Sequence, residues 1–127
     1  MKLWIDDVRP APEGYCWIKT VEDAKAAVQI SEKNIKHYME LGNVCFTARD
    51  YSGRTTAYKN ANNWLIELID IDHDAGDYAQ HGGDYIKLLD WLEETGRNYP
   101  IRIHSQNVVG RMNMRAIIER NGWTEVR

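Results

Sequence analysis

Short apolar runs that stop abruptly at charged or polar side chains constrain the fold of this chain more than any other feature. Three such runs occupy residues 2–5, 64–71 and 99–104, and acidic or histidine side chains stand at the end of each. Buried strands of a parallel sheet are continuous apolar runs of this kind, and their carboxyl ends leave the core at the same edge. The pattern therefore predicts an open parallel sheet with chemically active groups along one edge.

Segments with helical periodicity lie between these runs. We expect helices over about 21–42, 85–96 and 108–122, each with one apolar face and a glycine at or near its end. Thr20 and Asn107 stand where N-cap residues are found. Strands that alternate with amphipathic helices indicate an α/β fold whose sheet is covered by helices on both faces.

Residues 43–63 are the least regular part of the sequence. NVCFTA and RTTAYK resemble strands around the turn-forming DYSG, and NANN is typical of a loop. We expect a hairpin-like insertion here, or a second strand with an excursion.

Length and composition favour one compact domain over residues 1–127. No apolar run is long enough to span a membrane, and no signal-peptide pattern follows Met1, which predicts a cytoplasmic protein. The net charge is only −3, but the body is acidic and the C-terminal end basic. Such a polarity suits a phosphate together with its metal ion, although a solvated charged surface is the commoner explanation.

The polar groups at the ends of the runs are expected to converge, because ligands of open α/β sheets bind beyond the carboxyl ends of the strands. Carboxylates from separate strands are hard oxygen ligands, so the site is expected to bind a divalent metal, Mg²⁺ or Mn²⁺. The alternative is that these acids only cap the loops and helices that follow. The candidate metal ligands are Asp6, Asp7, Asp72 and Asp74.

Groups for proton transfer and phosphate binding accompany the acids. His73 and His104 suit an acid and a base, since imidazole titrates near neutral pH, although a lone histidine is more often structural. Ser105 and Asn107 precede a helix whose N-terminus can receive a phosphate, or they merely cap it. The candidate catalytic residues are His73, His104 and Asp72, and the candidate phosphate ligands are Arg9, Ser105, Asn107 and Arg111.

Three motifs resemble one known family. WIDDVRPAPEG, DIDHDAG and IHSQNVVGRMNM are similar to the LDDxRP, LDHDLG and HSxNPVGxxNM patterns of cyclic-phosphate-processing receiver-like domains, relatives of response-regulator receivers. The similarity covers nearly all of the chain outside residues 31–63. Val108 and Ala75 depart from the pattern, where the family often has Pro and Leu.

The resemblance implies a flavodoxin-like, receiver-like three-layer sandwich with a mostly parallel central sheet. It also implies activity on a cyclic phosphate ester, in an RNA end or a phosphate-containing small molecule such as a nucleotide derivative. The residues that it implicates are the acidic pocket of Asp6, Asp7 and Asp72, together with His73, Asp74, His104, Ser105 and Asn107.

Two functions remain open at this point. The first is metal-assisted, hydrolytic ring opening of the cyclic ester, and the second is a non-catalytic receiver-like signalling or nucleotide-sensing module. A phosphoacceptor receiver should carry a lysine after its last strand, whereas this chain ends in WTEVR. That difference weighs against phosphorelay, and the oligomeric state stays open.

Overall fold

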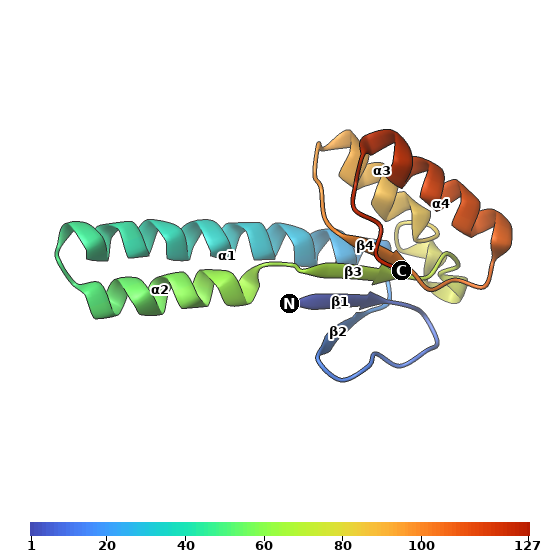
Figure 1. Cartoon of the computed structure of the whole chain (residues 1–127). Helices are drawn as coiled ribbons and strands as arrows, with labels where there is room; N and C mark the ends of the chain where they lie inside the picture. The colour runs from blue at the N-terminus through green and yellow to red at the C-terminus, as the bar shows by residue number, and fades with distance from the viewer. The chain divides into compact units, whose positions relative to one another are not determined.

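A four-stranded parallel sheet forms the centre of the computed structural model, which describes residues 1–127 (Figure 1). The order of the strands across the sheet is β2-β1-β3-β4, and every neighbouring pair is parallel. The predicted open parallel sheet is thus confirmed. The strands are β1 (Lys2–Ile5), β2 (Tyr15–Ile18), β3 (Leu68–Ile71) and β4 (Ile101–Ile103).

Four α-helices and one 3₁₀ helix lie between the strands or follow the last of them. Thr20 caps the first, because its Oγ1 accepts the backbone N–H of Asp23 at 3.0 Å. No helix is both long enough and apolar enough to cross a bilayer. The helices are α1 (Val21–Thr47), α2 (Tyr51–Trp64), η1 (Gly76–Gln80), α3 (Ile86–Glu94) and α4 (Val108–Asn121).

Contacts divide the chain into two compact units. Residues 1–26 and 66–127 form the sheet unit, and residues 27–65 form the helical hairpin, which consists of most of α1 together with α2. All four strands belong to the sheet unit, as do the apolar runs 2–5 and 99–104 and the part of run 64–71 that follows Leu65.

One face of the sheet forms the core of the sheet unit. The β2–β3 connection, the β3–β4 connection and the chain after β4 each lead toward the same edge of the sheet. Because crossovers between parallel strands are right-handed, the start of α1, α3 and α4 lie on that one face. Tyr85, just before α3, links that helix to the residues before α1, since its hydroxyl donates to the carbonyl of Lys19 at 2.7 Å. The strand side chains that are fully buried there are Leu3, Ile5, Ile69, Ile71 and Ile101.

The opposite face of the sheet departs from the expected three-layer arrangement. Only the β1–β2 connection leads toward the opposite edge of the sheet, and its residues 6–14 contain no helix. Within this chain, therefore, helices cover one face of the sheet, and the second helical layer is not formed. Trp4, Asp70 and Arg102 are paired in register, and they alternate with the buried core residues of their strands.

The strands predicted within residues 43–63 are wrong. α1 continues through residue 47, α2 starts at residue 51, and the NANN segment also lies in α2. Arg49 adopts a φ of 60°, and the Asp50 carboxylate caps α2 by accepting the N–H of Gly53 at 2.9 Å. The insertion is therefore a helix–turn–helix rather than a β-hairpin.

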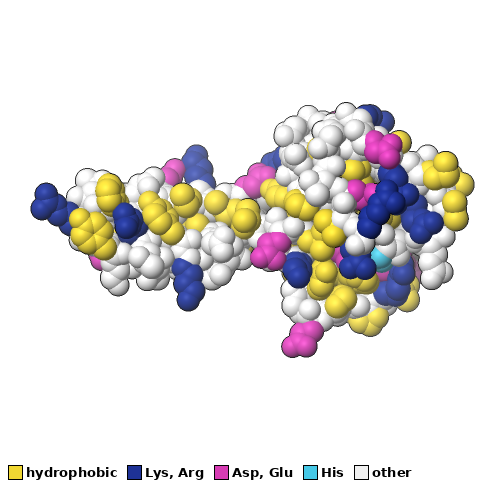
Figure 2. Space-filling model, viewed as in Figure 1, with side chains coloured by type: hydrophobic (Ala, Val, Ile, Leu, Met, Phe, Trp, Pro, Cys, Tyr) yellow, Lys and Arg dark blue, Asp and Glu magenta, His cyan; other side chains and the backbone are white.

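Small residues let the two helices of the hairpin approach closely. A Cβ at Gly42 would collide with the ring of Tyr58, and Ala57 and Ala61 are the buried side chains of α2. Ser31 is also buried, and its hydroxyl donates to the carbonyl of Trp64 at 2.6 Å. Such a narrow contact leaves large apolar side chains in solvent, and Figure 2 shows them along the hairpin.

Candidate functional site

Asp6, Asp72 and His104 each follow the last residue of one of three neighbouring strands, β1, β3 and β4. The hydrogen bonds between the parallel strands continue one residue further. The N–H of Asp72 donates to the carbonyl of Ile5 at 2.9 Å, and the N–H of His104 donates to the carbonyl of Ile71 at 3.0 Å. One ligand atom from each of the three side chains lies within 4.8 Å of the others. The predicted convergence at the edge of the sheet is present.

Asp6 is fully buried and anchors the loop after β1. Its Oδ1 accepts the backbone N–H groups of Val8 at 2.9 Å and Arg9 at 2.7 Å. Burial by itself would raise the pKa of Asp6, but these bonds, with His104 and the Arg9 charge, outweigh it and hold the pKa below its ordinary value. Asp6 is therefore kept as a carboxylate.

Arg9 bridges the acids of two strands. Its Nε contacts Asp6 Oδ2 at 2.8 Å, its Nη2 contacts Asp72 Oδ2 at 2.9 Å, and its Nη1 donates to the carbonyl of His104 at 3.2 Å. Burial lowers the pKa of Arg9, but the contacts with Asp72 and Asp6 outweigh it, so the net shift is upward. The guanidinium is the nearby positive charge that clustered carboxylates require.

His104 is held by carboxylates at both ring nitrogens. Nε2 lies 2.9 Å from Asp6 Oδ2, and Nδ1 lies 2.6 Å from Asp70 Oδ1. The imidazole stacks on Trp4, with centroids 3.9 Å apart and planes 3° from parallel. Asp70 was not predicted as a site residue, although an acid inside the apolar run LIDI was a visible signal.

His73 forms a second group with Asp74 and Asn107. Its Nδ1 lies 2.9 Å from Asp74 Oδ1, and the Asn107 amide nitrogen is 3.3 Å from Asp74 Oδ2. The hydrogen bond with His73 lowers the pKa of Asp74. Gly110 of α4 lies against the His73 ring, where a Cβ would collide with it, so a larger residue would push the helix away.

Asn107 caps the last helix, and Ser105 stabilises the turn before it. Asn107 Oδ1 accepts the N–H of Gly110 at 2.8 Å, and Ser105 Oγ accepts the N–H of Asn107 at 3.1 Å. These contacts do not remove the two residues from the site, because both also line a cavity. The side-chain amide of Asn107 thereby links the start of α4 to Asp74 in the loop after β3.

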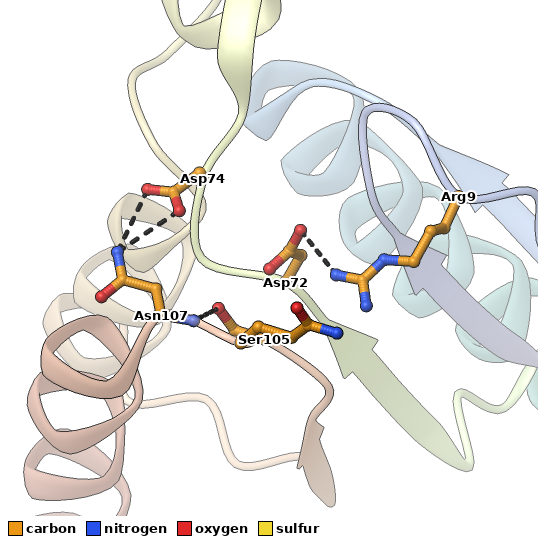
Figure 3. A pocket seen from close by; sticks show the side chains of 6 residues that line it. Arg9, Asp72, Asp74, Ser105 and Asn107 are labelled. Carbon is orange, nitrogen blue, oxygen red and sulfur yellow. Dashed lines mark hydrogen bonds and ion pairs between the residues drawn. The ribbon is translucent and has the colours of Figure 1, made fainter.

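That cavity has a volume of about 270 Å³ and opens at the edge of the sheet (Figure 3). Figure 3 shows Arg9 and Asp72 on one side and Asp74 with Asn107 on the other. Gln106 lines it too and was not predicted, since an isolated glutamine carries no pattern. The lining residues are Arg9, Asp72, Asp74, Ser105, Gln106 and Asn107.

Five predicted residues lie outside the cavity lining, namely Asp6, Asp7, His73, His104 and Arg111. Asp6 and His104 contact Arg9, and His73 contacts Asp74, so these three each touch a residue that lines it. Asp7 lies beside Gly76, and burial followed by the charges of Asp6 and Asp72 raises its pKa. Arg111 is exposed in the first turn of α4.

The donor set of Asp6, Asp72 and His104 fits a divalent cation. Two carboxylate oxygens suit Mg²⁺ or Mn²⁺, and an imidazole nitrogen is compatible with transition metals. A bound ion would share with Arg9 the same carboxylates that the guanidinium contacts. The site thus offers three donors for a cation and a positive side chain next to them.

Comparison with known proteins identifies a family. A family model described as Cyclic-phosphate processing Receiver domain matches residues 45–120, which is more than half of the chain. No curated protein and no solved structure matched the chain. The matched range contains α2, β3, α3, β4 and most of α4, and hence Asp72 and His104, whereas Asp6 and Arg9 precede it. The four-stranded parallel fold is accordingly receiver-like, and the chain belongs to the family of cyclic-phosphate-processing receiver domains.

Proposed function

We propose that this domain opens the ring of a cyclic phosphate ester by metal-assisted hydrolysis. The substrate is an RNA end that carries a 2′,3′-cyclic phosphate or a related nucleotide derivative. The observation that carries the proposal is the approach of Asp6, Asp72 and His104 to within 4.8 Å of one another, with Arg9 and Asp72 also bordering the cavity.

The acids supply the cation site. Asp6 and Asp72 would hold Mg²⁺ or Mn²⁺, with Asp7 and Asp74 as further acids close to them in the chain. A bound cation polarises a phosphoryl oxygen and lowers the pKa of bound water. Asp72 belongs to both the metal site and the catalytic group, because it follows the central strand and also lines the cavity.

Basic, hydroxyl and amide side chains would bind the phosphate. Arg9 contacts two carboxylates, yet 43% of its side chain is exposed, so it can also face an anion in the cavity. Ser105 and Asn107 line the cavity at the N-terminus of α4, where the helix dipole favours negative charge. Arg111, exposed one turn into α4, would contribute by turning toward the bound phosphate.

The histidines supply the proton transfers. Water attacks phosphorus, the bond to one ring oxygen breaks, and that oxygen leaves as an alkoxide. His104 gives the alkoxide its proton while His73 takes the proton of the attacking water, so that the products are a phosphate monoester and a free hydroxyl. The contacts of His104 with Asp6 and of His73 with Asp74 orient both rings for these roles.

A nucleotide-sensing module is the second candidate. It is favoured by the ion pairs of Arg9 with Asp6 and Asp72, because acids that are already neutralised allow anion binding without a metal. Phosphorelay is a weaker possibility, since WTEVR offers no lysine after the last strand. Labelling of Asp72 by acetyl phosphate would support that third reading.

The deciding experiment incubates the protein with 2′,3′-cyclic nucleotides and Mg²⁺ or Mn²⁺ and follows products by ³¹P NMR. We expect metal-dependent ring opening that is lost in His104→Ala and in Asp72→Asn. Asp77→Asn is the matched control, because Asp77 is an exposed acid of η1 outside the cavity. Binding of the nucleotide without turnover would instead establish the sensor.

A further inference from the structure

Asp70 has an unusual environment for a carboxylate. It lies inside β3 between Ile69 and Ile71, and only 1% of its surface is exposed. Its Oδ2 has no hydrogen-bond partner, since the nearest cation, Arg102 Nη1, is 3.8 Å away. A buried carboxylate oxygen without a hydrogen bond lowers the stability of a fold, so its presence requires an explanation other than packing.

The other oxygen of Asp70 supplies that explanation. Oδ1 lies 2.6 Å from His104 Nδ1, and an ionised carboxylate can only accept hydrogen bonds. Nδ1 of His104 is therefore the donor in this bond, which directs that nitrogen toward Asp70. Because this bond is short and shielded from water, it holds the ring strongly in its plane.

Two further contacts complete the restraint on His104. Trp4 stacks on the imidazole at 3.9 Å and 3°, which opposes tilting of the ring out of its plane. Nε2 points the other way, toward Asp6 Oδ2 at 2.9 Å, and belongs to the cluster with Asp72. The nitrogen that faces the acids is thus selected by the carboxylate behind the ring.

We propose that Asp70 is a positioning residue, which fixes the orientation of the His104 ring so that Nε2 faces Asp6 and Asp72. The inference rests on the proposed function only in assuming that Nε2 acts as a metal ligand or proton carrier. Carboxylates that hold metal-binding histidines in this manner change metal affinity by about 10- to 100-fold when they are removed.

The first test needs no variant. Long-range ¹H–¹⁵N spectra of the metal-free wild-type protein report which nitrogen of His104 is protonated, and the assignment is made by comparison with His104→Ala. We expect a protonated Nδ1. An Nδ1 without a proton would overturn the proposal, whatever the protein does to cyclic phosphates.

The second test removes the charge of Asp70 and keeps its shape. In Asp70→Asn the amide can donate to Nδ1 as well as accept from it, so we expect a smaller fraction of molecules with a hydrogen on Nδ1 of His104. Affinity for Mn²⁺ alone, measured by electron paramagnetic resonance of the free ion, should fall about 10- to 100-fold. Asp77→Asn removes an exposed acid of η1 and should change neither quantity.

Stability separates positioning from a structural role. Asp70→Asn should unfold at the wild-type temperature or above it, because the substitution removes a buried charge, whereas a structural ion pair would make the variant less stable. An unchanged hydrogen at Nδ1 together with unchanged Mn²⁺ affinity would refute the proposal even if ring opening occurs. Conversely, the expected changes at Nδ1 and in Mn²⁺ affinity, in a protein without hydrolytic activity, would refute only the proposed function.

Discussion

The sheet unit and the helical hairpin solve the problem of burying apolar surface in opposite ways. In the sheet unit, continuous apolar strands pack against helices, and their inward side chains are fully buried. In the hairpin, small residues form the contact between two helices, and several larger apolar side chains stay in solvent. Those exposed side chains are Ile30, Met39, Leu41, Val44, Phe46, Tyr51 and Leu65.

The comparison also shows that the candidate site is built from one unit only. The acids, the histidines and Arg9, from which the candidate site is built, belong to the sheet unit, and the hairpin contributes none of them. Parallel strand ends place polar side chains at fixed spacings, whereas two helices in contact along small residues create no such edge. Substitutions in the two units should therefore differ in kind as well as in size.

The largest difference should appear in catalysis. Asp6→Asn removes a charge that contacts both Arg9 and His104, and we expect ring opening to fall by roughly 10²-fold or more. Lys59→Ala, at an exposed position of α2, should retain wild-type turnover. Initial rates by ³¹P NMR provide the measurement, and a comparable loss in both variants would remove the functional distinction between the units.

Core truncation should give the next largest difference. Ile69 is fully buried in β3, so Ile69→Ala should lower the free energy of unfolding by roughly 2 to 5 kcal/mol. Ile30 is 50% exposed on α1, and Ile30→Ala should cost about 0.5 kcal/mol or less. Urea unfolding followed by circular dichroism measures both, and equal costs would contradict the burial contrast.

The helix caps permit a finer comparison. Asp50→Ala removes the cap of α2 and Asn107→Ala that of α4, and each should lower stability by about 1 kcal/mol. Only Asn107→Ala should also impair the reaction, because Asn107 lines the cavity. If the α2 cap affected turnover as strongly, the hairpin would have a part in catalysis that its residues do not suggest.

The smallest effect concerns pH. Hydrogen bonds from Arg120 and then Asn121 lower the pKa of Glu93 from 4.5 to about 2. Since the folded state favours the ionised form, the stabilisation is complete above pH 4.5 and is lost as the pH falls toward 2. The pair is solvent-exposed, so Glu93→Gln should weaken the acid dependence of unfolding only slightly. If Glu93→Gln left the pH dependence of unfolding unaltered, this surface pair of the sheet unit would have no stabilising role.

The sequence was most informative where one local rule decided the outcome. Apolar runs that end in acids or a histidine predicted β1, β3 and β4, and the caps at Thr20 and Asn107 are as expected. It was least informative where local preference and tertiary contact disagree. RTTAYK has the β-branched and aromatic residues of a strand, yet packing against α1 makes it helical.

β2 was missed for a related reason. YCWI is a short edge strand in which Cys16 and Trp17 are exposed, so its burial does not follow from its apolar composition. Its partner is β1, to which it is joined by the loop that carries Arg9. Only pairing with β1 distinguishes this segment from the loop before it.

By itself, the sequence determined that acids and a histidine leave three apolar strands at their carboxyl ends, because strand direction and burial follow from local composition. Tertiary structure decided which of these groups meet: it joined Arg9 to Asp6 and Asp72 and placed Asp70 behind His104. Hydrogen bonds act over about 3 Å. Such contacts depend on the register between strands and the path of each loop, which no local pattern specifies.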